Sequence, residues 1–181
     1  MNFTVDWFVN NIGVWESIVL PMVPRDAQIL EIGSYEGKST IWMAEHFPDA
    51  IIECVDTFKG GMEHENTEGL LNRFKENTKE FKLRIKTHIG YSNKEVRKFN
   101  EDRFDLIYID GSHQSKDVLT DAVQAWYCLK VGGLMVFDDY GWDAYPQPEL
   151  NPGLAIDCFL SAFIGHYEVM HKEYQVILKK I

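Results

Sequence analysis

Acidic side chains stand at the ends of four of the five apolar runs that could form a parallel sheet. They are Glu31, Asp56, Asp110 and the pair Asp138-Asp139, while Gly90-Tyr-Ser-Asn follows the remaining run. In an open parallel sheet, ligands bind beyond the carboxyl ends of the strands, so these positions share one edge. Ordinary turns do not need acids at four of five strand ends. The pattern therefore predicts a binding or catalytic site at that edge.

Short apolar runs alternate with helix-length amphipathic segments, which indicates crossover units and a mostly parallel sheet. The expected strands span 28–32, 51–56, 83–89, 104–110 and 132–139 with a hairpin in 167–180, and the expected helices span 37–47, 67–80, 93–99, 115–129 and 153–164. Gly132-Gly133 is expected to end the long helix. The predicted fold class is α/β, a single Rossmann-like, doubly wound sheet with an antiparallel C-terminal hairpin. We expect one domain (27–181) preceded by an N-terminal helical segment (1–26).

The first strand leads into the loop Glu31-Ile-Gly-Ser-Tyr-Glu-Gly-Lys-Ser. The dinucleotide pattern GxGxxG fails there, and a phosphate-binding P-loop would need one more residue between its glycines. The loop instead suits a cofactor without phosphates, held by backbone amides and the start of a helix, although an ordinary turn is the alternative. Asp56 lies 23 residues beyond Gly33, where an acid accepts hydrogen bonds from ribose hydroxyls. Together they indicate an adenosine ligand without pyrophosphate.

The pattern Glu31-x-Gly33-x-Tyr35-x-Gly37-x-Ser39 resembles the first motif of class I S-adenosylmethionine-dependent methyltransferases. It is most similar to the branch of catechol O-methyltransferase and the macrolide-sugar O-methyltransferases, over about residues 27–140. The resemblance implies S-adenosylmethionine as cofactor and a hydroxyl of a small molecule as methyl acceptor. The cofactor-binding residues that it implies are Glu31, Gly33, Ser34, Tyr35, Gly37, Ser39, Asp56, Thr57, Phe58, Ser92, Asn93 and Asp110.

The same resemblance implies a metal site and a catalytic base. Asp110, Asp138 and Asp139 match the metal-binding acids of that branch, and three carboxylates suit Mg²⁺. Related methyltransferases also keep such an acid without a metal, so both alternatives stay open. His113 stands where the catechol enzyme carries a basic lysine, which makes it and Asp110 the candidate catalytic residues. A histidine could take the hydroxyl proton, or this loop could only cap the following helix.

Aromatic side chains in the segments 58–66 and 140–152 are candidates to line the acceptor pocket, together with one methionine. They are Phe58, Met62, Tyr140, Trp142 and Tyr145. Each could stack on an aromatic or sugar ring. A lid packed on the domain, or a contact with a partner chain, is the alternative use of these loops. Trp42 and Trp126 are expected in the core.

Composition narrows the remaining function classes. The 28 acidic and 18 basic residues give a formal charge of −10, which disfavours general nucleic-acid binding. No apolar run is long enough to cross a bilayer, no basic residue precedes Arg25 as a signal peptide would require, and three scattered cysteines suit a reducing compartment. We therefore expect a cytoplasmic protein without membrane partners, and a homodimer is left open. The alternatives to a methyltransferase are a P-loop-like nucleotide-binding protein and a non-catalytic S-adenosylmethionine-binding module.

Overall fold

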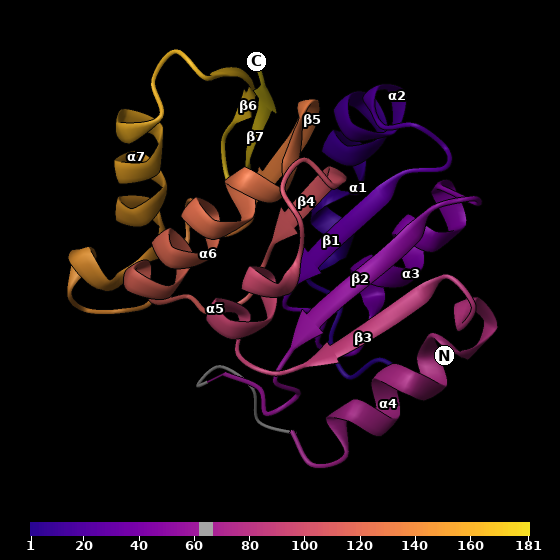
Figure 1. Ribbon diagram of the computed structural model, residues 1–181. Helices are drawn as coiled ribbons and strands as arrows, with labels where there is room; N and C mark the ends of the chain where they lie inside the picture. Colours follow the sequence, from indigo (N-terminus) through magenta and orange to yellow (C-terminus); the bar gives the residue numbers. More distant parts are fainter. Residues whose placement is uncertain (62–66) are drawn as a thin grey trace.

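The computed structural model describes residues 1–61 and 67–181 and contains a seven-stranded sheet in the order β3-β2-β1-β4-β5-β7-β6 (Figure 1). The strands are β1 (Gln28–Ile32), β2 (Ile51–Asp56), β3 (Ile85–Ile89), β4 (Phe104–Ile109), β5 (Leu129–Phe137), β6 (Tyr167–Lys172) and β7 (Val176–Lys180). The first five strands pair in parallel, and β7 pairs antiparallel with both β5 and β6. The predicted parallel sheet with an antiparallel C-terminal hairpin is confirmed.

Helices cover both faces of the sheet, as near-continuous apolar strands require. They are α1 (Ile12–Val14), α2 (Leu20–Met22), α3 (Lys38–His46), α4 (Leu70–Asn77), α5 (Ser92–Glu95), α6 (Ser115–Cys128) and α7 (Pro152–Ala162). The N-terminal helices, α3 and α4 lie on one side of the sheet, and α5, α6 and α7 lie on the other (Figure 1). The order of the strands reverses at β1, so the crevice for a ligand lies between β1 and β4.

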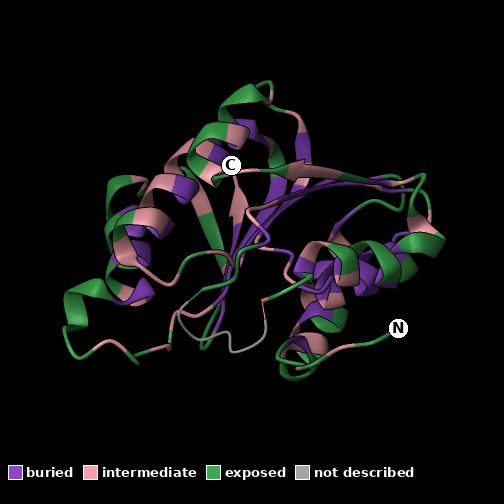
Figure 2. Cartoon of the chain, turned by 90° about the horizontal axis from the view of Figure 1, so that it is seen from below, coloured by how far each residue is buried: buried purple, intermediate pink, exposed green. Residues whose placement is uncertain are grey.

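Two apolar clusters fill the space between the sheet and its helices. On one face, Trp15 and Trp42 pack with Tyr108; on the other, Trp126 and Phe159 pack with strand residues such as Phe137. Seen along the sheet edge, buried residues lie between the two helical layers while the outer helix surfaces are exposed (Figure 2). The core positions predicted for Trp42 and Trp126 are confirmed.

The N-terminal segment is helical from Phe8 to Met22, through a 3-10 turn (Phe8–Asn11), α1, a π-helical turn (Trp15–Val19) and α2. Trp15 is fully buried there, and its Nε1 donates to Oε1 of Gln175 over 3.0 Å. This bond fastens the segment to the sheet. In the described part of the chain, no helix has the length and apolar character needed to cross a membrane.

The helix stop predicted at Gly132-Gly133 is wrong. The helix α6 already ends at Cys128, and both glycines lie inside β5. The pairing register between β4 and β5 shifts beside them, between Phe104 and Leu106. A Cβ on Gly133 would come within 3.0 Å of the carbonyl oxygen of Asp105. The glycine pair therefore permits an irregularity in the strand, which a sequence rule for helix ends does not distinguish.

Candidate functional site

A cavity of about 1130 Å³ lies along the carboxyl ends of the parallel strands. Main-chain hydrogen bonds continue beyond the strands and hold the loops side by side. Gly33 donates to the carbonyl of Val55, Asp110 to that of Ile32, and Asp138 to that of Ile109, all over 2.8 to 2.9 Å. The acids that the sequence places after separate strands are thereby brought to one edge, as predicted.

The loop after β1 contains backbone conformations with positive φ, which glycine adopts more easily than other residues. Gly33 has φ +89° and Gly37 has φ +85°, while Tyr35 takes the left-handed conformation at φ +45°. A Cβ on Gly33 would overlap the main-chain carbonyl oxygen of Asp110. The close approach of these two loops therefore requires glycine at position 33.

Glu31 is a buried structural anchor for this loop. Its carboxylate accepts hydrogen bonds from the hydroxyls of Ser34 (2.6 Å), Ser39 (2.5 Å) and Thr40 (2.5 Å). Burial raises the pKa of Glu31 above its ordinary value, against the lowering effect of these three hydroxyls. The side chain thus ties the end of β1 to the first turn of α3. In this arrangement it positions the loop and is enclosed by protein groups.

Asp56 joins the first loop to the loop after β2. Its Oδ2 accepts from the backbone amides of Ser34 (2.9 Å) and Tyr35 (2.8 Å), and its Oδ1 accepts from the amide of Phe58 (2.6 Å). A carboxylate has about four acceptor positions, so these three bonds leave capacity for a ligand hydroxyl. Asp56 is half-buried and borders the cavity.

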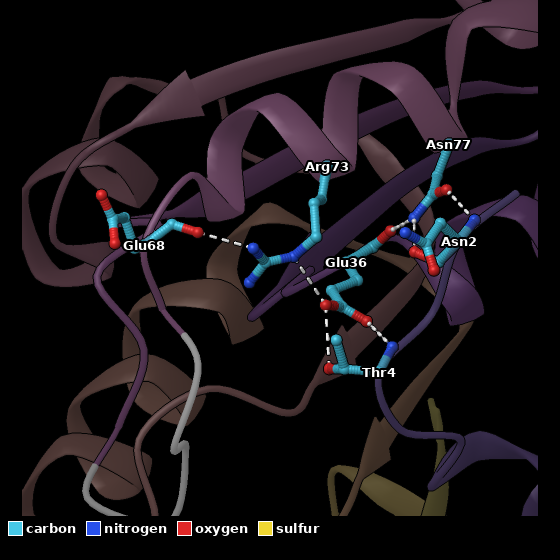
Figure 3. Close-up of polar contacts among 6 residues, drawn as sticks. All are labelled: Asn2, Thr4, Glu36, Glu68, Arg73 and Asn77. Carbon is cyan, nitrogen blue, oxygen red and sulfur yellow. Dashed lines mark hydrogen bonds and ion pairs between the residues drawn. The ribbon is translucent and has the colours of Figure 1, made fainter.

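The N-terminal segment is latched onto the first loop (Figure 3). The buried Glu36 accepts from the amide and hydroxyl of Thr4 over 2.7 and 2.9 Å and pairs with Arg73 of α4 over 2.8 Å. Asn77 of α4 accepts from the amide of Asn2 and donates to the carbonyls of Asn2 and Glu36. The latch brings Trp7, whose ring lies 5.5 Å from that of Tyr35, into the cavity wall.

A hydrogen-bonded group of acids forms the floor of the cavity near β4 and β5. The buried Tyr108 hydroxyl donates to both Asp138 and Asp110. Burial raises the pKa of Asp110 well above its ordinary value, and the neighbouring charges of Asp138 and Asp139 raise it further. Burial and the charge of Asp139 likewise raise the pKa of Asp138 to about 6. Ionisation of these acids is therefore unfavourable in the cavity, and a positive ligand would favour their charged form.

His113 and Asp139 form a pair at the same end of the cavity. Nε2 of His113 lies 2.8 Å from Oδ2 of Asp139, and both side chains are mostly buried. Asp139 also accepts from the hydroxyl of Tyr174 over 3.0 Å and takes a left-handed backbone, with φ +60°. The ring of Trp142 lies 4.7 Å from that of His113. These contacts hold the histidine ring at the wall of the cavity. From there it could take a proton from a bound ligand.

The three carboxylates predicted to hold Mg²⁺ do not fit the ion as they are arranged. Oδ2 of Asp138 already receives hydrogen bonds from Tyr108, Asn11 and Gln175, and its Oδ1 receives the amide of Asp139. Among residues 1–61 and 67–181, no group of three histidine, cysteine or acidic side chains has the geometry for a metal. Mg²⁺ would need these donors to turn away, because it requires near-ideal octahedral oxygen ligands.

The structure brings most predicted site residues to the cavity. Those bordering it are Gly33, Tyr35, Asp56, Thr57, Ser92, Asn93, Asp110, His113, Asp138 and Asp139. Glu31, Ser34, Gly37 and Ser39 form the loop around it, and Phe58 is buried with its ring 5.0 Å from that of Phe74. Their roles toward a ligand stay predictions.

Of the predicted acceptor-pocket residues, Trp142 and Tyr145 border the cavity, with ring centroids 4.9 Å apart. Tyr140 is turned toward Asp157 and Lys172, and Met62 lies outside the described residues.

Sequence reasoning missed several residues of the cavity wall. Trp7, Phe8 and Asn11 come from the N-terminal segment, and Asp121 comes from α6. A signal for Asp121 existed, because it stands three residues after Val118 and one before Ala122 on the apolar face of the helix. Nothing in the sequence around residue 7 indicates that this segment contacts Tyr35 and Asp138 at the carboxyl ends of the strands.

A family model described as a methyltransferase domain matches residues 30–140, more than half of the chain. The chain belongs to this methyltransferase domain family. An uncharacterised protein of Acanthamoeba polyphaga mimivirus is 25% identical over 153 residues, which cover 76% of this chain and 64% of that protein. The chain thus spans less than two thirds of the length of that relative.

Solved structures share the methyltransferase fold at low sequence identity. A Clostridium thermocellum protein assigned as an rRNA methylase gives a TM-score of 0.73 at 11% identity, with 99% of this chain and 98% of that chain covered. The MycE methyltransferase of the mycinamycin biosynthetic pathway, solved with Mg and SAH, gives 0.62 at 20% identity, with 99% and 51% covered. The Rossmann-like α/β fold, predicted from the alternation of strands and helices, is confirmed.

Proposed function

We propose that this protein transfers the methyl group of S-adenosylmethionine to a hydroxyl of a small molecule. The observation that carries the proposal is a single cavity that joins the first loop and Asp56 to the His113–Asp139 pair. The methyltransferase domain supports the transfer chemistry. The hydroxyl acceptor is supported by the histidine base at the end of that cavity.

The residues of this cavity fit the cofactor. Asp56 keeps acceptor capacity for ribose hydroxyls, and Gly33 and Tyr35 of the first loop border the same cavity. When bound, S-adenosylmethionine supplies a methyl group on a positively charged sulfur. Burial and mutual repulsion raise the pKa of Asp110 and Asp138 on the floor of the same cavity, and a positive ligand would stabilise the ionised form of these carboxyls.

His113 takes the proton of the acceptor hydroxyl in this proposal. The carboxylate of Asp139 orients the ring and stabilises the imidazolium, as an acid beside a histidine base does. The hydroxyl oxygen forms the new bond to the methyl carbon as the carbon–sulfur bond breaks, and the proton stays on His113. The protein contributes mainly alignment and a deprotonated nucleophile.

Trp142 and Tyr145, which lie beside His113, give the acceptor end flat apolar walls. Such walls favour a ring-shaped acceptor, aromatic or sugar. No step of the proposal is routed through Mg²⁺, because donors occupy Asp138. Turnover measured with added Mg²⁺ and with a chelator tests this: a requirement for the ion would show that the floor rearranges into a metal site.

Calorimetric titration with S-adenosylmethionine, ATP and NAD tests the cofactor. Binding of S-adenosylmethionine alone supports the proposal, whereas binding of ATP alone would replace it with a nucleotide-binding protein. Release of S-adenosylhomocysteine in the presence of a panel of catechols, phenols and sugars then tests turnover. Cofactor binding without any release would indicate a non-catalytic binding module.

His113→Gln tests the base once an acceptor is found. We expect turnover to fall by about 10² to 10⁴-fold with cofactor affinity changed by less than about twofold, because the base acts on the acceptor. His166→Gln, in an exposed position on the far side of the domain, is the matched control. Equal turnover in wild type and His113→Gln would show that His113 only shapes the loop.

A further inference from the structure

Asp121 is a buried acid that the proposed chemistry does not use. It lies in the second turn of α6, only 2% exposed, and borders the cavity. Its Oδ1 is fully buried and has no hydrogen-bond partner in the described part of the chain. A buried acceptor left unpaired costs roughly 1–3 kcal/mol, so folded proteins rarely keep one without a reason.

Asp121 and the His113–Asp139 pair lie at different ends of the cavity. The hydroxyl of Ser92, which follows β3, lies beside its carboxyl, and a Cβ on Gly111 would come 3.9 Å from its Oδ2. The His113–Asp139 pair instead lies where β5 ends. Since β3 and β5 stand on opposite sides of β1 and β4, Asp121 faces the end of the cavity away from the base.

A nucleoside cofactor has its reacting sulfur on one side of the ribose and its base on the other. With the sulfur toward His113 and the ribose at Asp56, the base lies toward Ser92 and Asp121. The base of an adenosine carries an exocyclic amino group, which is a hydrogen-bond donor and has no acceptor role. The unpaired oxygen of Asp121 is an acceptor of the matching kind.

We propose that Asp121 is the residue that selects a 6-amino purine, with its Oδ1 accepting a hydrogen bond from the amino group of the cofactor. This inference rests on the proposed function and adds a specificity-determining residue to it. A 6-oxo purine would put a carbonyl oxygen against the carboxylate. Sites with a buried polar group reject analogues that leave it unpaired, by about 10-fold or much more.

Calorimetric titration of two product analogues tests the inference without any turnover. The probes are S-adenosylhomocysteine and S-inosylhomocysteine, which differ only in the amino or oxo group at C6 of the base and in the hydrogen that the 6-oxo purine carries on N1. The wild type is expected to bind the adenosyl compound at least about 10-fold more tightly, and Asp121→Asn to lower that ratio below about threefold, because an amide can also donate. Asp117→Asn removes the same charge one helical turn away and should keep the ratio of the wild type.

Three results would overturn the inference. The first is a wild type that binds both compounds within threefold, which needs no variant and stands even if Asp121→Asn fails to fold. The second is an unchanged ratio in both Asp121→Asn and Asp121→Ala. The third is an equal loss in Asp117→Asn, which would make net charge the cause. If the wild type binds neither compound, the proposed function itself fails, and this outcome is distinct from the other three.

Discussion

Replacing Asp121 by asparagine is expected to stabilise the fold at neutral and alkaline pH and to have little effect in acid. Burial raises the pKa of the Asp121 carboxyl to about 7, with a further contribution from Asp117 on the same helix and an opposing one from Ser92 of α5. In an unfolded chain the pKa of an aspartate is about 3.9. The folded state therefore holds this proton over a range of about three pH units in which the unfolded state has lost it.

The direction in which the stability changes with pH follows from that difference in pKa between the folded and the unfolded state. Below about pH 4 both states are protonated, and between about pH 4 and 7 the free energy of unfolding falls as the unfolded carboxyl ionises. Above pH 7 both states are ionised and the loss is complete, at about 4 kcal/mol for a shift of about three units. Water in the adjoining cavity screens the charge, so we expect about 2 to 4 kcal/mol.

Urea unfolding of the wild type and Asp121→Asn at pH 5 and pH 8 measures the effect. The stability difference should grow by about 1 to 3 kcal/mol in favour of the variant between the two pH values, because about two of the three pH units of the loss lie above pH 5 and asparagine does not titrate. Glu168→Gln, at an exposed position of β6, controls for the loss of a negative charge. A difference of the same size at both pH values would refute the argument that Asp121 is a desolvated acid.

Three further changes test the site and its supports. Asp56→Ala removes two hydrogen bonds to the first loop and one within its own loop, and it should weaken S-adenosylhomocysteine binding by about 100-fold or more in a calorimetric titration; a change below threefold would contradict its role. Gly33→Ala should lose at least about 3 kcal/mol of stability in urea, since its methyl group would overlap the carbonyl of Asp110, and wild-type stability would show that the two loops lie apart. Arg73→Met leaves the buried Glu36 without its cation and should cost about 3 kcal/mol in thermal or urea unfolding; a loss under 0.5 kcal/mol would show that the pair is open to water.

The sheet could be predicted because its strands are marked by local signals. Runs such as Ile51–Asp56 and Phe104–Ile109 are mainly apolar, and an acid ends the first and follows the second, so both their extent and the edge that carries the site follow from the sequence. Gly132-Gly133 could not be placed in the same way. Glycine is used both to end helices and to admit irregular strands, and the pairing with β4 decides between these uses.

The candidate site was predictable where a motif sits on one loop and not where distant segments meet. Gly33 and Asp56 follow from spacing alone, and the structure places both at the cavity. The donors that occupy Asp138 come from Asn11, Tyr108 and Gln175, far apart in the chain. The sequence shows three carboxylates suited to a metal ion. It does not show which of their oxygen atoms already accept hydrogen bonds from other residues of the protein.

The latch that Thr4 and Asn2 form with Glu36 and Asn77 has a practical consequence for handling the protein. A purification tag or fusion partner joined ahead of Asn2 emerges next to α4 and competes with those bonds, which hold the segment that carries Trp7 to the cavity wall. The other end of the chain is different, because β7 runs away from the cavity and Ile181 bonds to His166 at the opposite edge of the sheet. Affinity tags and surface-immobilisation chemistry therefore belong at the carboxyl terminus, where they leave the N-terminal latch and the cavity wall intact while binding kinetics are measured.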